Sequence, residues 1–354
     1  MMMELSKTSR RRLAALVASI VLALGLCHLV VEGFGLRFAQ PTEDVTLQTL
    51  ATVVREERRV EVAFVGSSRM RRAITVPVVE ATLQETLGRP VTAFNFGLQG
   101  GVASSFAVVV RDVLRDERLP KVIVLGLGAR SLNGNSPRQA RAIRHLYAPG
   151  DLLGSLGPRR VEEFAASLYL LFRAPTTLLQ LWRAPAAEVS TLVAGGGSFY
   201  CPVEGPVPLD IHEAEKIYGA KWVAEAVEKT ESKGREGAQA RRNLLADFEI
   251  GRAGVALELI VDLCQERGVT LVVVNLPVTP TFRALAYQHG EYDAYLSRVR
   301  ALSEVEGFAF VDLAEPPWLP HECFFADGVY LNQVGAHGLS ARIAREVVAP
   351  LLAE

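Results

Sequence analysis

Two short segments, far apart in the chain, carry side chains that could perform acyl chemistry. The apolar run at 62–65 stops at Gly66-Ser67-Ser68-Arg69, and a serine just past a strand is a common position for a nucleophile. Near the C-terminus, Asp327-Gly328-Val329-Tyr330 resembles a catalytic Asp-x-x-His loop with tyrosine in place of histidine. Both segments also fit ordinary turns, since glycine, serine and Asp-Gly pairs favour turns.

Tyrosine at position 330 leaves the serine without an obvious base. A serine hydroxyl is a weak nucleophile until a base takes its proton, and imidazole suits that task. A phenol is protonated at neutral pH and is a poor base, and the loss of a general base costs roughly 10²- to 10⁴-fold in rate. His321, in a Pro-rich loop before Asp327, is the first candidate for a substitute base, and His337 in the last predicted helix is the second. A surface or capping role stays open for both histidines.

Two further segments follow predicted strands. The first ends in Asn95-Phe96-Gly97, and the second is the glycine-containing stretch 128–135, which includes Arg130. The carboxyl ends of parallel strands meet at one edge of a sheet, where ligands bind. We therefore expect the following residues to lie near one another: Ser68, Gly97, Arg130 and Asp327.

In order and spacing, these four segments resemble the sequence blocks of the SGNH/GDSL hydrolase superfamily, most closely its membrane-anchored bacterial envelope members. The resemblance covers roughly residues 60–145 and 250–350. It implies that Ser68 is the nucleophile, with Ser67 where better-known members have aspartate. It also implies that the N–H of Gly97 and the guanidinium of Arg130 hold the oxyanion, with Asn95 beside them. Arg130 stands where the family has asparagine, so a salt bridge in a loop is an equally open interpretation.

The resemblance implies ester hydrolysis or O-acyl transfer, often of acetyl groups, on an envelope polysaccharide. In this hypothesis Asp327 orients whichever base exists, and an acylated glycan or another ester is the substrate. The alternative is a catalytically inactive pseudoenzyme that binds glycan or partners a membrane O-acyltransferase. We expect no organic cofactor and no metal, and the cysteines lack spacing typical of zinc ligands.

Residues 13–31 form an apolar run that nearly spans a bilayer core of about 30 Å at 1.5 Å per residue. Lys7, Arg10, Arg11 and Arg12 precede this run, which places the tail 1–12 in the cytoplasm. The sequence thus predicts a single-pass inner-membrane protein with an anchor at 13–31, a linker at 32–60 and a periplasmic domain. A cleaved signal peptide and a lipoprotein signal ending at Cys27 are less favoured alternatives, because neither has a convincing small-residue cleavage site.

The composition fits one sizeable folded domain at 61–354. The 354-residue chain is 49% hydrophobic and 22% charged with a net charge of −1, which argues against disorder and against nucleic acid as a partner. Apolar runs predict strands buried on both faces at 61–65, 91–95, 122–127, 270–276 and 308–313. Helical spacing predicts helices at 78–87, 102–118, 253–266, 292–306 and 334–352. The alternation predicts a three-layer α/β/α fold with a mainly parallel, five-stranded, flavodoxin-like sheet, interrupted by a helical insert at about 146–250.

Four other side chains have open roles. Cys264 lies on a predicted helix, where a small buried hydrophobe is expected. Cys201 and Cys323 lie in Pro-containing loops and could form a disulfide outside the cytoplasm, although their sequence separation says nothing about their distance. Asn275, at the end of the fourth predicted strand, either points toward the shared edge of the sheet or caps its loop.

Overall fold

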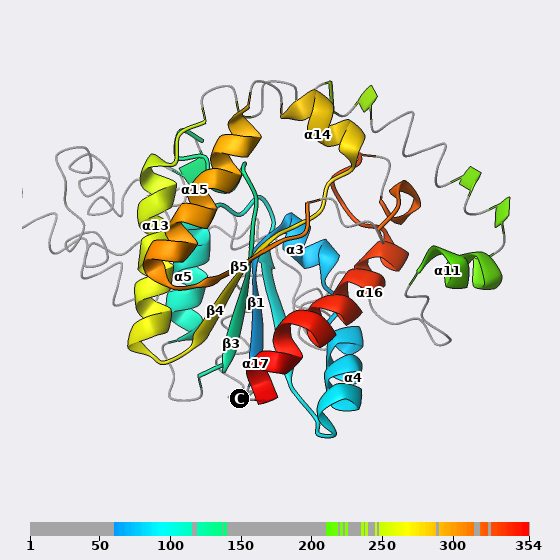
Figure 1. Ribbon diagram of the computed structural model, residues 1–354, viewed down its shortest axis with the longest axis horizontal. Coiled ribbons are helices and arrows are strands. Elements are labelled where there is room, and N and C mark those ends of the chain that lie inside the picture. The colour runs from blue at the N-terminus through cyan, green and yellow to red at the C-terminus, as the bar shows by residue number, and fades with distance from the viewer. Residues whose placement is uncertain are drawn as a thin grey trace, which may run out of the picture. The chain divides into compact units, whose positions relative to one another are not determined.

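The computed structural model describes most of residues 60–353 (Figure 1). The described ranges are 60–114, 119–136, 138–139, 210–218, 248–287, 290–314, 319–324 and 327–353, with a few residues between 220 and 245. They belong to one compact unit. The predicted anchor at 13–31 and most of the predicted insert lie outside these ranges. Within them, no helix has both the length and the apolar character that a membrane span requires.

A parallel sheet forms the centre of the domain. Its strands are β1 (Val62–Ser67), β2 (Ala93–Leu98), β3 (Val122–Leu127), β4 (Thr270–Asn275) and β5 (Ala309–Asp312). The strand order is β2-β1-β3-β4-β5, and every neighbouring pair is parallel. This is the 2-1-3-4-5 order of flavodoxin-like, doubly wound sheets. The predicted α/β class is therefore confirmed.

Helices lie on both faces of the sheet (Figure 1). One face carries α5 (Ala103–Val113), α13 (Gly251–Glu266) and α15 (Glu291–Glu306). The other carries α4 (Val76–Leu87), α16 (Gln333–Arg342) and α17 (Ala349–Ala353), with the π-helical segment Ile343–Val348 joining the last two. All of the predicted helices are present with shifted ends. The shorter helices α3 (Ser68–Ala73) and α14 (Pro280–Ala286) were not predicted, whereas α11 (Ile211–Tyr218) lies within the predicted helical insert.

Burial of the strands follows their place in the sheet. β2 and β3 are buried at every position, whereas in β5 the end residues Ala309 and Asp312 are exposed and the two between them are half-buried. The prediction that every strand is buried on both faces is therefore wrong for β5. Both β2 and β5 are edge strands, but α3 and α4 pack against β2 and leave it no exposed residue.

The thiol of Cys264 is buried in α13, as the sequence predicted, and burial raises its pKa from 9.0 to about 12. The folded protein therefore keeps a neutral thiol at pH values where the unfolded chain has already ionised. Ionisation of the thiol in the unfolded chain lowers the free energy of unfolding. The stability that the buried thiol contributes is therefore complete below pH 9 and is lost as the pH rises from 9 to about 12.

We expect Cys264→Ala to lower the free energy of unfolding relative to the parent. Above pH 9 this difference should shrink by up to about 1.4 kcal/mol per pH unit, because only the parent has a thiol that titrates. Urea unfolding of the variant and the parent at pH 8, 9.5 and 10.5 measures the difference. Ile260→Val, in the same buried face of α13, is the non-titrating control and should give a loss that does not depend on pH. An equal loss at all three pH values for Cys264→Ala would contradict the prediction.

Candidate functional site

Ser68 lies where β1 passes directly into a helix. β1 ends at Ser67 and α3 begins at Ser68, without an intervening loop. The side chain of Ser67 accepts a hydrogen bond from the N–H of Arg69 at 3.3 Å, as an N-cap serine does. The sequence predicted the first helix of the domain at 78–87, but α3 comes before it. The direct strand-to-helix passage holds Ser68 at the carboxyl edge of the sheet.

Ser68 borders a small cavity of about 60 Å³ at this edge. The cavity is lined by segments that follow different strands, including Gly100 after β2, Gly128 and Arg130 after β3, and Leu276 after β4. Holding one water takes roughly 10–15 Å³ of such volume, so the cavity has room for a few waters or a small acyl group. Of the four residues predicted to lie together at this edge, Ser68 and Arg130 line the cavity, whereas Gly97 and Asp327 do not.

Tyr330 faces Ser68 across this cavity. The Oγ of Ser68 and the phenolic oxygen of Tyr330 are 2.8 Å apart and share a hydrogen bond in which either oxygen could be the donor. Tyr330 lines the cavity, and the guanidinium carbon of Arg72 lies 4.6 Å from the centroid of its ring. A phenol thus occupies the position beside the serine where a serine hydrolase keeps its base.

Asp327 shapes the turn that aims Tyr330. One carboxylate oxygen, Oδ1, accepts hydrogen bonds from the N–H groups of Val329 and Tyr330, each at 3.1 Å. Gly328 has a φ of +67°, and a Cβ there would lie 2.6 Å from the hydroxyl of Thr279. The N–H of Thr279 in turn donates to the carbonyl of Gly328 at 2.9 Å. Asp327 therefore acts on the site at least by fixing the backbone before Tyr330.

The segment beyond Tyr330 is held at both ends. Leu331 forms an isolated antiparallel bridge with Phe324. Asn332 caps α16 by accepting from the N–H of Gly335 at 3.1 Å, and its side-chain amide donates to the carbonyl of Glu322 at 2.5 Å. These contacts tie the Tyr330 loop to the short helix η2 (His321–Cys323). The tyrosine is thus part of an ordered loop.

The two histidines considered as substitute bases lie in different surroundings. His321 is the first residue of η2, but its side chain is outside what the structure describes, so its role as a base stays a prediction. His337 lies in α16, is fully buried and does not line the cavity. Cys323, which follows His321 in η2, has a buried free thiol, and its suggested partner Cys201 lies outside the described residues.

Gly97 and Asn95 are not among the residues that line the cavity. The N–H of Gly97 donates to the side-chain oxygen of Asn95 at 3.0 Å. The amide nitrogen of Asn95 donates to the carbonyls of Met70 and Ile74, each at 3.1 Å. Asn95 is fully buried, so its side chain serves as a bridge between β2 and the end of α3. The structure thus places these two residues beneath the site.

After β2, the glycines that border the cavity are Gly100 and Gly101. Gly100 has a φ of +69°, a conformation that favours glycine, and the N–H of Gly101 donates to the carbonyl of Leu98 at 3.1 Å. The sequence signal that could have identified them is the glycine pair itself, because two glycines after a strand allow a backbone to approach a ligand closely. Of the predicted residues, the structure brings Ser68, Arg130 and Tyr330 to the cavity.

Asn275 belongs to a buried polar cluster beside the cavity. Its amide nitrogen donates to the hydroxyl of Tyr292 and to the carboxylate of Asp312, each at 2.8 Å. Tyr295 donates to the carbonyl of Leu127 at 3.1 Å. Burial, the largest influence, raises the pKa of Tyr292 to about 12. The cluster keeps neutral hydroxyls under the loops, and Asn275 itself does not line the cavity.

Comparisons with known proteins leave the site to be judged from its own geometry. No protein-family model matches the chain, and no curated protein matches it either. Within the described ranges, no group of histidine, cysteine and acidic side chains is arranged to hold a metal ion.

Proposed function

We propose that the protein performs serine-dependent chemistry on acyl esters, either hydrolysis or O-acyl transfer. The observation that carries this proposal is the 2.8 Å hydrogen bond between Ser68 and Tyr330 in a cavity at the carboxyl edge of a parallel sheet. A serine at a strand-to-helix passage, with a proton-carrying partner and a small adjoining space, is suited to acyl transfer.

In the proposed reaction, the Oγ of Ser68 attacks the ester carbonyl carbon and gives its proton to the Tyr330 oxygen. Tyr330 passes its own proton to the leaving-group oxygen as the carbon–oxygen bond breaks. This relay needs no net charge on the phenol, because Tyr330 loses one proton and gains another. A water or an acceptor hydroxyl then attacks the acyl-serine, and the relay runs in reverse to regenerate both residues.

Two cavity-lining groups are suited to hold the oxyanion that forms during the attack. Arg130 can offer charge-assisted hydrogen bonds from the rim of the cavity, where it is exposed. The second candidate is the backbone N–H of Gly100. We prefer it to the N–H of Gly97, which donates to Asn95 and does not border the cavity.

The resemblance to SGNH hydrolases of the bacterial envelope supports an acylated envelope polysaccharide as the substrate. It also supports placing this domain on the periplasmic side of the inner membrane, with residues 13–31 as its anchor. A membrane O-acyltransferase is the partner that this arrangement favours, because such an enzyme could supply the acyl groups that Ser68 accepts.

Ser68→Ala tests the proposal. We expect cleavage of small acyl esters by the purified full chain to fall to the uncatalysed level, because the proposed acyl intermediate forms on the serine whose hydroxyl meets Tyr330. Initial rates with 4-nitrophenyl acetate measure this loss, and mass spectrometry of the quenched parent protein should show an acyl group on Ser68. Ser303→Ala, on the surface helix α15, is the matched control and should retain the parent rate. A Ser68→Ala rate equal to that of the parent would overturn the proposal.

The hydrogen bonds of Asp327 favour a second function, which is ligand binding without turnover. Its Oδ1 accepts two N–H groups of its own turn, and among the described side chains no imidazole lines the cavity. In that case Tyr330 fills the place of the base only as a hydrogen-bonding residue. Binding of an acylated glycan that persists in Ser68→Ala, together with an absence of turnover in the parent, would favour this function.

A further inference from the structure

The cavity beside Ser68 has a strongly positive lining. Arg69, Arg130 and Arg138 line it, and no acidic side chain is among the described residues that do so. Arg72 adds a fourth guanidinium beside Tyr330. A cleft that carries charge of one sign between protein walls attracts ligands of the opposite sign. The net charge of the chain is only −1, so this positive field belongs to the site.

Arg69 lies in the wall of the cavity, and only part of its guanidinium group donates hydrogen bonds to described residues. Nη2 donates to the backbone carbonyls of Leu276 and Pro277, at 2.5 and 2.8 Å. Nε is buried and has no hydrogen-bond partner in the described part of the chain. The described ion pairs do not include Arg69, whose side chain is only partly exposed. Two neutral carbonyl oxygens therefore orient its charge without neutralising it.

Two glycines make room for guanidinium groups at the cavity. A Cβ on Gly128 would lie 2.9 Å from Nη1 of Arg69, and a Cβ on Gly100 would lie 3.0 Å from Nη1 of Arg138. Both glycines line the cavity. Arg138 reaches it from the surface, where its Nη1 donates to the carbonyl of Gly100 at 3.4 Å. The two arginines thus approach the same space from two different segments.

A partly buried cation without a counter-ion is costly unless a ligand supplies the opposite charge. Guanidinium groups bind carboxylates and phosphates through paired, charge-assisted hydrogen bonds. We propose that the substrate is anionic, with a carboxylate or phosphate close to its ester, and that Arg69 and Arg138 bind this group. The assignment rests on the proposed function in taking the bound molecule to be an ester. The anion itself is recognised whether or not Ser68 turns the ester over.

The test measures binding to the full-length Ser68→Ala protein, which cannot consume the probe. Three probes share one acetyl ester: a monoacetylated methyl glucoside, the matching methyl glucuronide, and the matching glucoside 6-phosphate. Titration calorimetry in low salt should show that at least one charged probe binds about 10-fold or more tightly than the neutral one. Comparing the two charged probes identifies the carboxylate or the phosphate as the preferred group.

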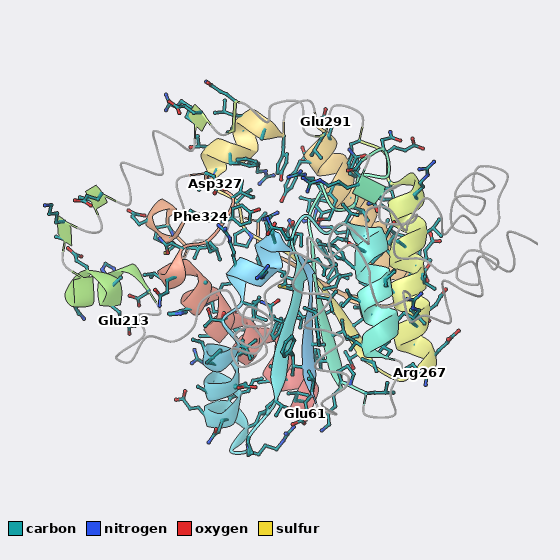
Figure 2. All side chains as sticks on the ribbon, turned by 180° about the vertical axis from the view of Figure 1, so that it is seen from behind. Glu61, Glu213, Arg267, Glu291, Phe324 and Asp327 are labelled. Atoms are coloured by element: carbon teal, nitrogen blue, oxygen red, sulfur yellow. The ribbon has the colours of Figure 1, made fainter. Side chains whose placement is uncertain are left out.

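Variants in the same background assign the preference to the two arginines. Arg69→Gln and Arg138→Gln should each reduce the preference for the charged probe several-fold, whereas Arg69→Lys should retain part of it. Arg138→Gln keeps the test usable if Arg69→Gln does not fold, because Arg138 is exposed. Arg267→Gln is the matched control, since Arg267 lies at the end of the molecule opposite Asp327 (Figure 2).

Equal binding of all three probes, or a preference that both Arg69→Gln and Arg138→Gln leave unchanged, would overturn the assignment. The outcomes for the two proposals are separable. A charge preference in protein that shows no Ser68-dependent turnover would leave anion binding standing and remove the catalytic function. Turnover that depends on Ser68 but is indifferent to charge would do the reverse.

Discussion

Replacing Tyr330 with histidine is expected to raise the cleavage of small acyl esters by about 10²-fold over the parent protein. Tyr330 is the residue in hydrogen-bond contact with Ser68, so an imidazole on the same loop enters the place that a general base needs. Asp327, three residues earlier, is then available to orient the new ring if its carboxylate leaves the turn N–H groups. Imidazole is shorter than phenol, so the expected gain is at the lower end of the range for general-base catalysis.

Initial rates of ester cleavage over pH 5 to 9 measure this gain, and the pH profile identifies its cause. Activity that rises through the ordinary titration range of imidazole, near pH 6.5, would show that the new histidine acts as the base. The double variant Ser68→Ala, Tyr330→His is the control and should lose the gain completely. An unchanged rate in Tyr330→His would mean that the loop does not bring position 330 close enough to remove the proton.

Tyr330→Phe separates the relay from a purely structural role of the ring. The phenyl ring keeps the contact with Arg72, whereas the hydroxyl that meets Ser68 is lost. If Tyr330 relays the proton, turnover should fall by about 10²-fold or more while the free energy of unfolding changes by less than about 2 kcal/mol. Parent activity in Tyr330→Phe would remove the relay from the mechanism.

The sequence was sufficient to predict the sheet and some of the residues that line the cavity, because both depend on local sequence patterns. Each strand is a short apolar run that ends near glycine or polar residues, and alternation with helices predicts a parallel sheet. Ser68 was found because it directly follows a buried strand, and Arg130 because it lies in the short segment after another one. The substitution of tyrosine at 330 was visible in the loop itself. Its direct contact with Ser68 is a finding of the structure.

The roles of Gly97 and Asn95 could not be found in this way, because they depend on a helix that carries no sequence pattern. α3 has six residues, three of them arginine, which is too short for an amphipathic period. Only its position across the sheet shows that Asn95 meets the carbonyls of Met70 and Ile74. The positive lining was hidden for the same reason, since Arg69 and Arg138 come from segments that the fold alone brings together.

Three glycines lie side by side on neighbouring strands beneath α3. Gly66 in β1 is the register partner of Gly97 in β2 and of Gly126 in β3. A Cβ on Gly66 would lie 2.7 Å from the Cβ of Met70, and a Cβ on Gly126 would lie 2.8 Å from the end of the same side chain. A Cβ on Gly97 would lie 2.5 Å from the backbone nitrogen of Arg71. This glycine row lets α3 lie directly on the sheet.

Gly97→Ala is therefore expected to destabilise the protein by about 3 kcal/mol, the upper part of the range for overpacking. The methyl group would meet backbone atoms of Arg71, which cannot rotate away as a side chain can, so α3 must shift as a unit. Because α3 begins at Ser68, the shift should also lengthen the contact with Tyr330 and lower ester turnover. Urea unfolding and initial rates measure the two effects on the same preparation.

Gly268→Ala is the control, because it replaces a glycine where the added methyl group meets no other atom. Gly268 has a φ of +64° and open space around its missing Cβ, so the substitution costs only the backbone strain of about 1 kcal/mol. It lies between α13 and β4, away from α3, and should leave ester turnover at the parent rate. If Gly97→Ala is no more destabilising than Gly268→Ala and keeps full activity, the close packing of α3 on β2 does not position Ser68. If it loses both stability and turnover, the glycine row is what places the serine at the cavity.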